Sequence, residues 1–183
     1  SFGLSRNQWL SLKDISVSPD HIVTVSQLTA KSSNPLTQNG RSRWGAERIE
    51  SDRYKNYLSE NNKSTPITVA VIDTGVDLDH PFIKDRLVPG YDFIDNDAVP
   101  DDKNMHGTHC SGIIKDNTPD NVKIMPVKGF NSDGRASDLS ISLGIDYAVK
   151  NGADILNMSF GGVCEEGYVC EQESAINRAI EAG

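Results

Sequence analysis

Residues 67–75 read Ile67-Thr68-Val69-Ala70-Val71-Ile72-Asp73-Thr74-Gly75, an apolar and largely β-branched run that ends in an acidic residue and a glycine. A run of this kind, without polar alternation, predicts a strand that is buried on both faces, as in a parallel sheet. Asp73 would then stand at the carboxyl end of the strand, which is the edge where sites form in open α/β sheets. Gly75 would permit a tight turn directly after it.

The remainder of the chain alternates between strand and helix patterns, which predicts βαβ units. We expect an α/β fold with a mostly parallel, doubly wound sheet and helices on both faces. Because the last predicted helix reaches Gly183, where a further strand would begin, we expect the fold to be incomplete in this chain. The other predicted elements are strands at 122–127 and 154–158 and helices at 47–58, 106–114, 137–150 and 171–182.

Residues 1–43 differ in texture from the rest, because they are polar and rich in Ser and Asn. They contain one strand candidate, at 22–25, and the stretch 31–43 has the composition of a linker. We therefore expect an N-terminal extension over 1–43 and a domain over 44–183.

Composition excludes some functions. The chain has 183 residues, 37% hydrophobic and 24% charged, which is ordinary for a globular domain. Its net charge of -8 argues against a nucleic-acid partner, because phosphate binding needs clustered Lys and Arg. No apolar run is long enough to cross a bilayer.

Asp73 allows several interpretations. It could belong to a pair of carboxylates that share a proton, as in aspartic proteases. It could bind a metal together with Asp77, His106 and His109, as in a metallohydrolase. It could orient a histidine in a Ser-His-Asp triad, or it could simply cap a loop.

The run His106-Gly107-Thr108-His109-Cys110-Ser111-Gly112 favours the triad. His106 is predicted at a helix N-terminus, where the helix dipole disfavours a permanently charged imidazolium and so suits a general base. Gly107 and Gly112 would let this helix approach the sheet closely. The two histidines lack the spacing of zinc-binding helices, and the all-β aspartic proteases conflict with the alternating pattern.

These motifs resemble the subtilisin-like serine proteases (subtilases), especially their thermitase and proteinase K branches. Residues 69–77 resemble the family's Asp motif and 106–112 its His motif, in the family's order and 33 residues apart from Asp73 to His106. Residues 154–162 are similar to the strand beside the substrate pocket. The resemblance covers 44–183 and implies a serine endopeptidase in which His106 is the base and Asp73 orients it.

Two departures from the family pattern accompany this resemblance. The Gly-Thr-Ser-Met-Ala motif that carries the nucleophile and the oxyanion Asn are not found in these residues, so we expect this chain alone to be inactive. The remaining C-terminal part of the catalytic domain, as a separate chain, is a partner that this implies. Met105 stands where the family usually has Gly and would crowd the turn before His106. An inactive, peptide-binding pseudoprotease is the alternative function.

The resemblance also implies a binding cleft for a protein or peptide substrate. An extended peptide would lie between two edge strands as an added strand. Phe160 would give one wall an apolar surface, and Arg135 would favour acidic residues upstream of the scissile bond. The residues implied are Ser159, Phe160 and Gly161 on one side and Gly134, Arg135 and Ala136 on the other.

Residues 91–101 resemble a calcium loop of the thermitase-like branch, which would hold a structural Ca²⁺ through oxygen ligands. The alternative is an acidic surface loop. The implied ligands are the carboxylates of Asp92, Asp95, Asp97 and Asp101 and the carbonyl of Val99.

The N-terminal segment 18–25 resembles the final strand of a subtilase inhibitory prodomain, and 32–43 would hold the maturation site. A zymogen of a secreted or cell-surface protease fits this, although a plain extension is the alternative. Cys164 and Cys170 lie six residues apart in a polar stretch, which favours a small-loop disulfide, or two reduced thiols in a cytosolic protein. Cys110 is interpreted as a small buried hydrophobe.

Overall fold

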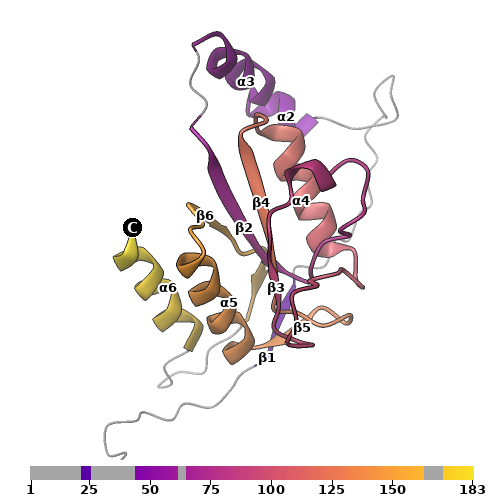
Figure 1. Cartoon of the computed structure of the whole chain (residues 1–183), viewed down its shortest axis with the longest axis vertical. Coiled ribbons are helices and arrows are strands. Elements are labelled where there is room, and N and C mark those ends of the chain that lie inside the picture. The colour runs from indigo at the N-terminus through magenta and orange to yellow at the C-terminus, as the bar shows by residue number, and fades with distance from the viewer. Residues whose placement is uncertain (1–21, 26–43, 62–64, 163–170) are drawn as a thin grey trace, which may run out of the picture.

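The computed structural model describes residues 22–25, 44–61, 65–162 and 171–183. Its largest element is a four-stranded parallel sheet in the order β3-β4-β2-β6 (Figure 1). The two central strands pair over their whole length, from Ile67 opposite Val122 to Asp73 opposite Lys128. The strands are β2 (Ile67–Asp73), β3 (Tyr91–Asp92), β4 (Val122–Lys128) and β6 (Ile155–Asn157).

Helices cover both faces of this sheet, as the sequence predicts (Figure 1). One face carries α5 (Asp138–Lys150) and α6 (Glu171–Ala182), and the other carries α4 (His106–Asn117). Ala70 and Ile72 of β2 belong to the core on the α5 face, whereas Val69 and Val71 belong to the core on the α4 face. This two-sided burial explains the lack of polar alternation in β2.

The helices differ from expectation at one place. The single helix predicted at 47–58 is two helices, α2 (Trp44–Arg48) and α3 (Ser51–Glu60), and α3 contacts α4. Between them Glu50 has φ 54, a left-handed conformation that ends the first helix before the second begins. The other predicted helices are confirmed, and α5 begins after Ser137, whose hydroxyl accepts the Ser140 N–H at 3.2 Å. A short 3₁₀ helix, η1, spans Lys84–Arg86.

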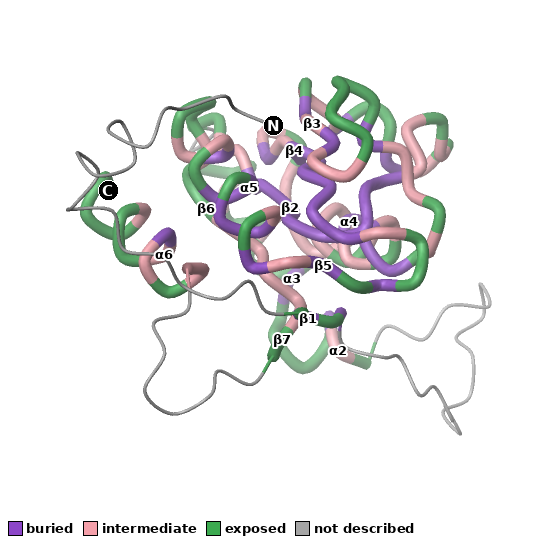
Figure 2. The backbone as a smooth tube through the Cα atoms, turned by 90° about the horizontal axis from the view of Figure 1, so that it is seen from below, coloured by how far each residue is buried: buried purple, intermediate pink, exposed green. Residues whose placement is uncertain are grey.

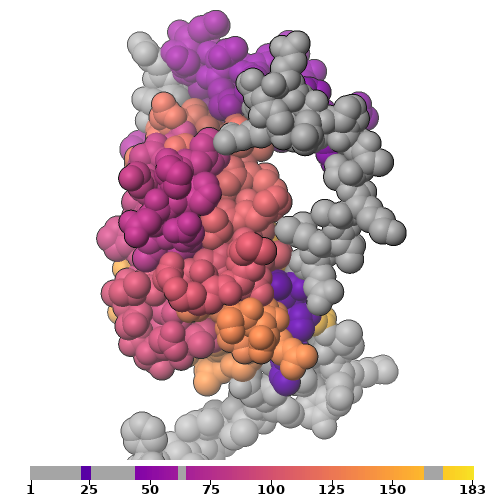
Figure 3. Space-filling model, turned by 90° about the vertical axis from the view of Figure 1, so that its right-hand side faces the viewer, coloured from indigo at the N-terminus to yellow at the C-terminus, as the bar shows by residue number. Residues whose placement is uncertain are grey.

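A second, smaller sheet lies at one end of the molecule (Figure 2). Its order is β5-β1-β7, and β1 (Ile22–Val25) runs antiparallel to both β5 (Arg135–Ser137) and β7 (Phe160–Gly161). Val23 is 1% exposed and, with Val25, joins the same core as β2 and α5. Figure 3 shows β1 at the surface, against the β5 region. The strand at 22–25 was predicted, but its place between these two strands was not.

Several predictions lie outside the described residues. Cys164 and Cys170, the linker 32–43 and the segment 18–21 are among them, and the division at residue 43 stays a prediction. Within the ranges that are described, no helix is long and apolar enough to span a membrane.

Candidate active site

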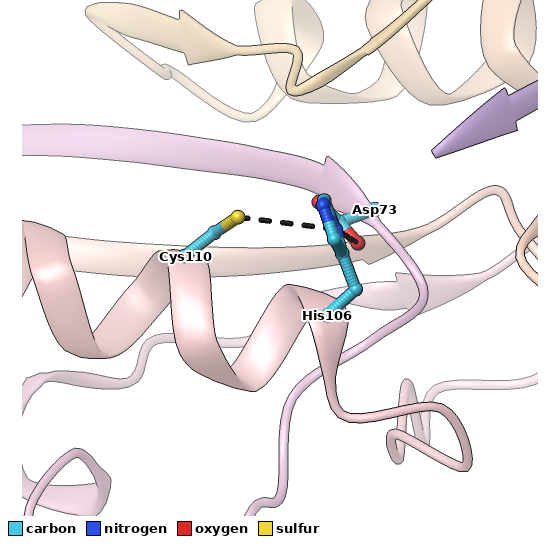
Figure 4. Close-up of side chains that lie close together, drawn as sticks. All are labelled: Asp73, His106 and Cys110. Carbon is cyan, nitrogen blue, oxygen red and sulfur yellow. Dashed lines mark hydrogen bonds and ion pairs between the residues drawn. The ribbon is translucent and has the colours of Figure 1, made fainter. Parts of the chain in front are cut away.

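Asp73 and His106 face each other where β2 ends and α4 begins (Figure 4). The Nδ1 atom of His106 lies 2.8 Å from Oδ1 and 2.9 Å from Oδ2 of Asp73. Asp73 is 0% exposed and His106 is 7% exposed. Because Nδ1 is committed to the carboxylate, Nε2 is the ring nitrogen that can accept a proton from a nucleophile.

The buried carboxylate has an altered acidity. Burial raises the pKa of Asp73, while hydrogen bonds from His106 and from the Thr74 N–H, at 2.7 Å, act in the opposite direction. The hydrogen bond from His106 therefore offsets part of the effect of burial on the pKa of Asp73.

Gly107 lets α4 approach the end of β2. A Cβ at this position would lie 2.1 Å from the carbonyl oxygen of Gly75 and 3.1 Å from Cβ of Asp73. Any side chain there would push His106 away from Asp73. Gly112 was predicted to act in the same way, and this was wrong, because its Cβ would meet nothing within 4 Å.

Met105, the departure from the family pattern, does not crowd the turn with its side chain, which is 78% exposed. Its backbone has φ 88, in the left-handed region where glycine is normally favoured. A non-glycine residue therefore adopts a strained backbone conformation directly before His106. The Asp73–His106 contact is made despite this strain.

Cys110 stands one turn after His106, and its Sγ lies 3.8 Å from His106 Nδ1 (Figure 4). Burial, and next the negative charge of Asp73, raise the pKa of the Cys110 thiol to about 11. A thiol with this pKa is neutral at physiological pH and is a poor nucleophile. The sequence analysis treated Cys110 as a hydrophobe and missed this contact, although a separation of four residues on a helix signals it.

The six residues predicted to bind substrate lie at or beside the strands that flank β1. Ala136 is buried, Arg135 is exposed, and the Phe160 ring packs 4.9 Å from the Phe130 ring. Gly134 accepts a hydrogen bond from the Val25 N–H at 3.0 Å. The structure thus brings Gly134, Arg135 and Ala136 to one side of β1 and Phe160 and Gly161, preceded by Ser159, to the other.

Residues 64–183 match the sequence profile of the subtilase family, as its Asp and His motifs predicted. The chain belongs to the subtilase family. It is 36% identical to thermitase from Thermoactinomyces vulgaris over 124 residues, which are 63% of this chain and 43% of that protein. The resemblance to the thermitase branch is thereby confirmed.

Other subtilases are similarly related. The thermophilic serine proteinase of Bacillus sp. (strain AK1) is 36% identical over 71% of this chain and 34% of its own length. The alkaline serine exoprotease A of Vibrio alginolyticus is 32% identical over 94% of this chain and 33% of its own length. The chain therefore spans between about a third and less than half of these relatives.

A solved subtilase structure confirms the fold class. The crystal structure of a cold adapted subtilisin-like serine proteinase superposes with a TM-score of 0.57 at 36% identity. The match covers 64% of this chain and 43% of that chain.

The alternative metal site of a metallohydrolase is not assembled. Among the residues that the structure describes, one group brings three candidate ligand atoms within 4.8 Å, and it consists of Asp73, His106 and Cys110. His109 is exposed and does not belong to it, and Asp77 uses its Oδ1 to accept the Asp79 N–H at 3.2 Å.

The predicted calcium loop is folded, but its first carboxylate has an internal partner. Asp92 is buried, and its Oδ2 lies 2.8 Å from Nζ of the buried Lys128. Asp95 is exposed and lies 3.9 Å from the same ammonium group. Lys128 thus places a positive charge beside two of the four predicted carboxylates.

The rest of this loop is more open. Asp97 is exposed and accepts the Val99 N–H at 2.8 Å, and Asp101 forms an ion pair with Lys103. The Val99 carbonyl accepts the Asp101 N–H at 2.7 Å. The donor atoms are of the type that Ca²⁺ prefers, yet the loop already satisfies part of them.

Asp102 is a site residue that the sequence analysis missed. Its carboxylate accepts hydrogen bonds from the hydroxyls of Thr74 and Thr108. Burial raises the pKa of Asp102, but the bonds from Thr108, Asn104 and Thr74 outweigh it and lower the pKa below its usual value. The signal available in the sequence was an acidic residue four positions before His106 and a threonine two positions after it.

Proposed function

We propose that the whole protein is a serine endopeptidase in which Asp73 and His106 activate a serine that lies outside these 183 residues. The observation that carries this proposal is the buried contact of Asp73 with Nδ1 of His106. In this geometry His106 would take the proton from the serine hydroxyl through Nε2, and Asp73 would stabilise the imidazolium that forms. Membership of the subtilase family supports the same roles.

Its substrates would be extended peptides. The pairing of β1 supports this, because β1 is an extended segment that runs antiparallel to β5 and β7, and its Val25 N–H donates to Gly134 O at 3.0 Å. Val23 and Val25 are buried, while Ile22 and Thr24 are exposed. We therefore expect the cleft to prefer apolar side chains at alternate positions of a substrate.

β1 itself would act as an inhibitor that belongs to the chain. A substrate cannot pair with β5 and β7 while β1 occupies the space between them. This supports residues 1–43 as the end of a prodomain plus a linker, and hence a zymogen of a secreted or cell-surface protease. Release of β1 would be the step that opens the cleft.

A peptide-binding pseudoprotease is the second candidate. The same β5-β1-β7 sheet favours it, because strand pairing and the burial of Val23 and Val25 need no nucleophile. The two functions differ in whether a reactive serine completes the pair.

A fluorophosphonate probe tests the proposal on the native protein, followed by intact masses of every polypeptide present. We expect one labelled serine, outside residues 1–183, and at least about a 10²-fold slower reaction in His106→Ala, since a general base contributes about 10²–10⁴. His109→Ala is the matched control, one turn along the same helix. No label on any chain would favour the pseudoprotease, and loss of peptidase activity with His109→Ala would favour the metallohydrolase.

A structural Ca²⁺ would be held by the loop of Asp92, Asp95, Asp97, Val99 and Asp101. Its oxygen donors support binding, while the ammonium of Lys128 opposes it. Calcium titration by calorimetry, with Asp97→Asn as the weakened variant, tests this. Binding that is absent in both proteins would leave the segment as an acidic surface loop.

A further inference from the structure

Asp102 is the most heavily hydrogen-bonded carboxylate beside the Asp73–His106 pair that the structure describes. It lies on the loop before α4. Its Oδ1 accepts the Thr74 hydroxyl at 2.8 Å and the N–H groups of Asn104 and Met105 at 2.8 and 3.0 Å. Its Oδ2 accepts the hydroxyl and the N–H of Thr108 at 2.6 and 3.0 Å.

Each of the two threonine hydroxyls also accepts a backbone N–H. Thr74 Oγ1 accepts the Gly107 N–H at 3.0 Å, and Thr108 Oγ1 accepts the Asp77 N–H at 2.9 Å. A hydroxyl has one proton to donate. Because Asp102 takes both hydroxyl protons, the lone pairs of both threonines remain available for the N–H groups.

These bonds join the two segments that carry the catalytic pair. In one bond the threonine belongs to the β2 side, and in the other it belongs to α4. Thr74 follows Asp73 directly and binds α4 at Gly107, the residue after His106. Thr108, on α4, binds the loop after β2 at Asp77. Two hydrogen bonds thereby fix the first turn of α4 to the residues that directly follow Asp73.

We propose that Asp102 is a positioning residue, which holds the Asp73–His106 pair in register by fixing the direction of the Thr74 and Thr108 hydroxyls. The proposal deepens the proposed function and rests on it for its catalytic meaning. The geometric claim, however, concerns this pair in the resting protein and can be tested without any substrate.

The charge of Asp102 matters to this role because a carboxylate is only an acceptor. Asparagine would present an NH₂ group to one of the two hydroxyls, and two donors would then face each other. That threonine would have to turn its proton elsewhere and would weaken its bond to the backbone N–H. The shape at residue 102 would stay nearly the same while the direction of the hydrogen bonds changed.

The test compares Asp102→Asn with Asp154→Asn in the isotope-labelled protein. Asp154 is a matched control, because its carboxylate accepts the Thr68 N–H at 2.7 Å near the opposite end of β2. The readouts are the proton NMR signal of the His106 Nδ1–H and the exchange rate of the Gly107 and Asp77 amides. We expect Asp102→Asn to shift or broaden the imidazole signal and to speed exchange at least tenfold, and Asp154→Asn to do neither.

Two further variants each remove one threonine hydroxyl and so test the two hydrogen bonds to the backbone one at a time. Thr74→Val should speed exchange at Gly107 and disturb the His106 signal, whereas Thr108→Val should speed exchange at Asp77. These variants also keep the proposal testable if Asp102→Asn does not fold. An unchanged His106 signal in folded Asp102→Asn, or in Thr74→Val where the former is unfolded, overturns the proposal.

The NMR readouts, taken together with the fluorophosphonate reaction, distinguish the positioning role of Asp102 from the proposed protease function. NMR effects as expected in a protein that never reacts with a fluorophosphonate would support the positioning role and remove the protease function. In a reactive protein, we expect Asp102→Asn to lower kcat with little change in KM, because the side-chain hydrogen bonds of Asp102 go to Thr74, Asn104, Met105 and Thr108, which lie outside β5 and β7. Reactivity together with an unchanged His106 signal would remove the positioning role alone.

Discussion

The Asp73–His106 pair and the strands β5 and β7, which we propose to bind peptides, are held in the molecule in different ways. The pair lies where the end of β2 meets the start of α4. Thr74 donates its N–H to Asp73 and its hydroxyl to Asp102, and the Thr74 hydroxyl also accepts the Gly107 N–H. β5 and β7 have only three and two residues, and their partner in the sheet is β1, which comes from a distant part of the chain. We infer that the first region stays fixed, whereas the second is built around a strand, β1, that can be exchanged for a peptide.

The largest effect that would test the fixed region is expected for Gly107→Ala. The new Cβ would lie 2.1 Å from the Gly75 carbonyl oxygen, and overpacking against backbone costs about 3 kcal/mol or more. Gly112→Ala, on the same helix, should instead stabilise by up to about 1 kcal/mol, because alanine is the better helix former. Urea unfolding of both variants measures this, and equal effects would contradict the close approach of α4 at Gly107.

The exchangeable region is tested by Val23→Asp, with Thr24→Asp as control. Val23 is buried and Thr24 is exposed, and a carboxylate in an apolar site costs several kcal/mol. We expect β1 to leave the cleft, so that hydrogen exchange at the Val25 amide loses its protection while the amides of β4 keep theirs. If the amides of β4 lose protection as well, β1 is a fixed part of the core, and the proposed difference between the two regions is wrong.

A third prediction concerns the acidity of Cys110 in the fixed region. Its pKa rises from 9.0 to about 11, so at pH 8 the folded protein should hold roughly 100-fold less thiolate than the unfolded chain. The folded state retains the proton and the unfolded state releases it, so stability should fall as pH rises from 9 to 11.

Iodoacetamide alkylation, mapped to Cys110 by mass spectrometry, measures this pKa. The rate should still be rising above pH 9, and Asp73→Asn should bring the rise to lower pH because it removes a nearby negative charge. A rate that levels off near pH 9 would show that burial and Asp73 do not act on this thiol.

The smallest effect is expected for Arg135→Glu, on β5 beside β1. Arg135 is exposed and pairs in register with Thr24, and exposed ion pairs contribute about 1 kcal/mol or less. In Val23→Asp protein, a peptide with Asp opposite Arg135 should lose affinity a few-fold, and one with Lys should gain. Lys150→Glu, at the other end of α5, changes the charge equally and should not alter the ratio of the two peptides.

Local patterns predicted much of this molecule. The apolar run of β2, the strand of β4 and the spacing of apolar residues in α5 and α6 are readable because burial on one or two faces leaves a period in the sequence. The break between α2 and α3 at Glu50 was not predicted, because a left-handed backbone conformation leaves no pattern in the hydropathy of the sequence. The prediction that Gly112 lets α4 approach the sheet was wrong, because a small residue in a helix does not reveal which face of the helix it occupies.

The sequence by itself determined that Asp73 ends a buried strand and that His106 begins a helix, since both follow from residues close together in the chain. The tertiary structure alone decided that β1 fills the space between β5 and β7, because strand pairing uses backbone groups that every residue shares. It also decided the hydrogen bonds of Asp102 and the surroundings of Cys110. The direction of a hydroxyl proton and the acidity of a thiol depend on groups that other elements bring close, and no local pattern encodes these distances.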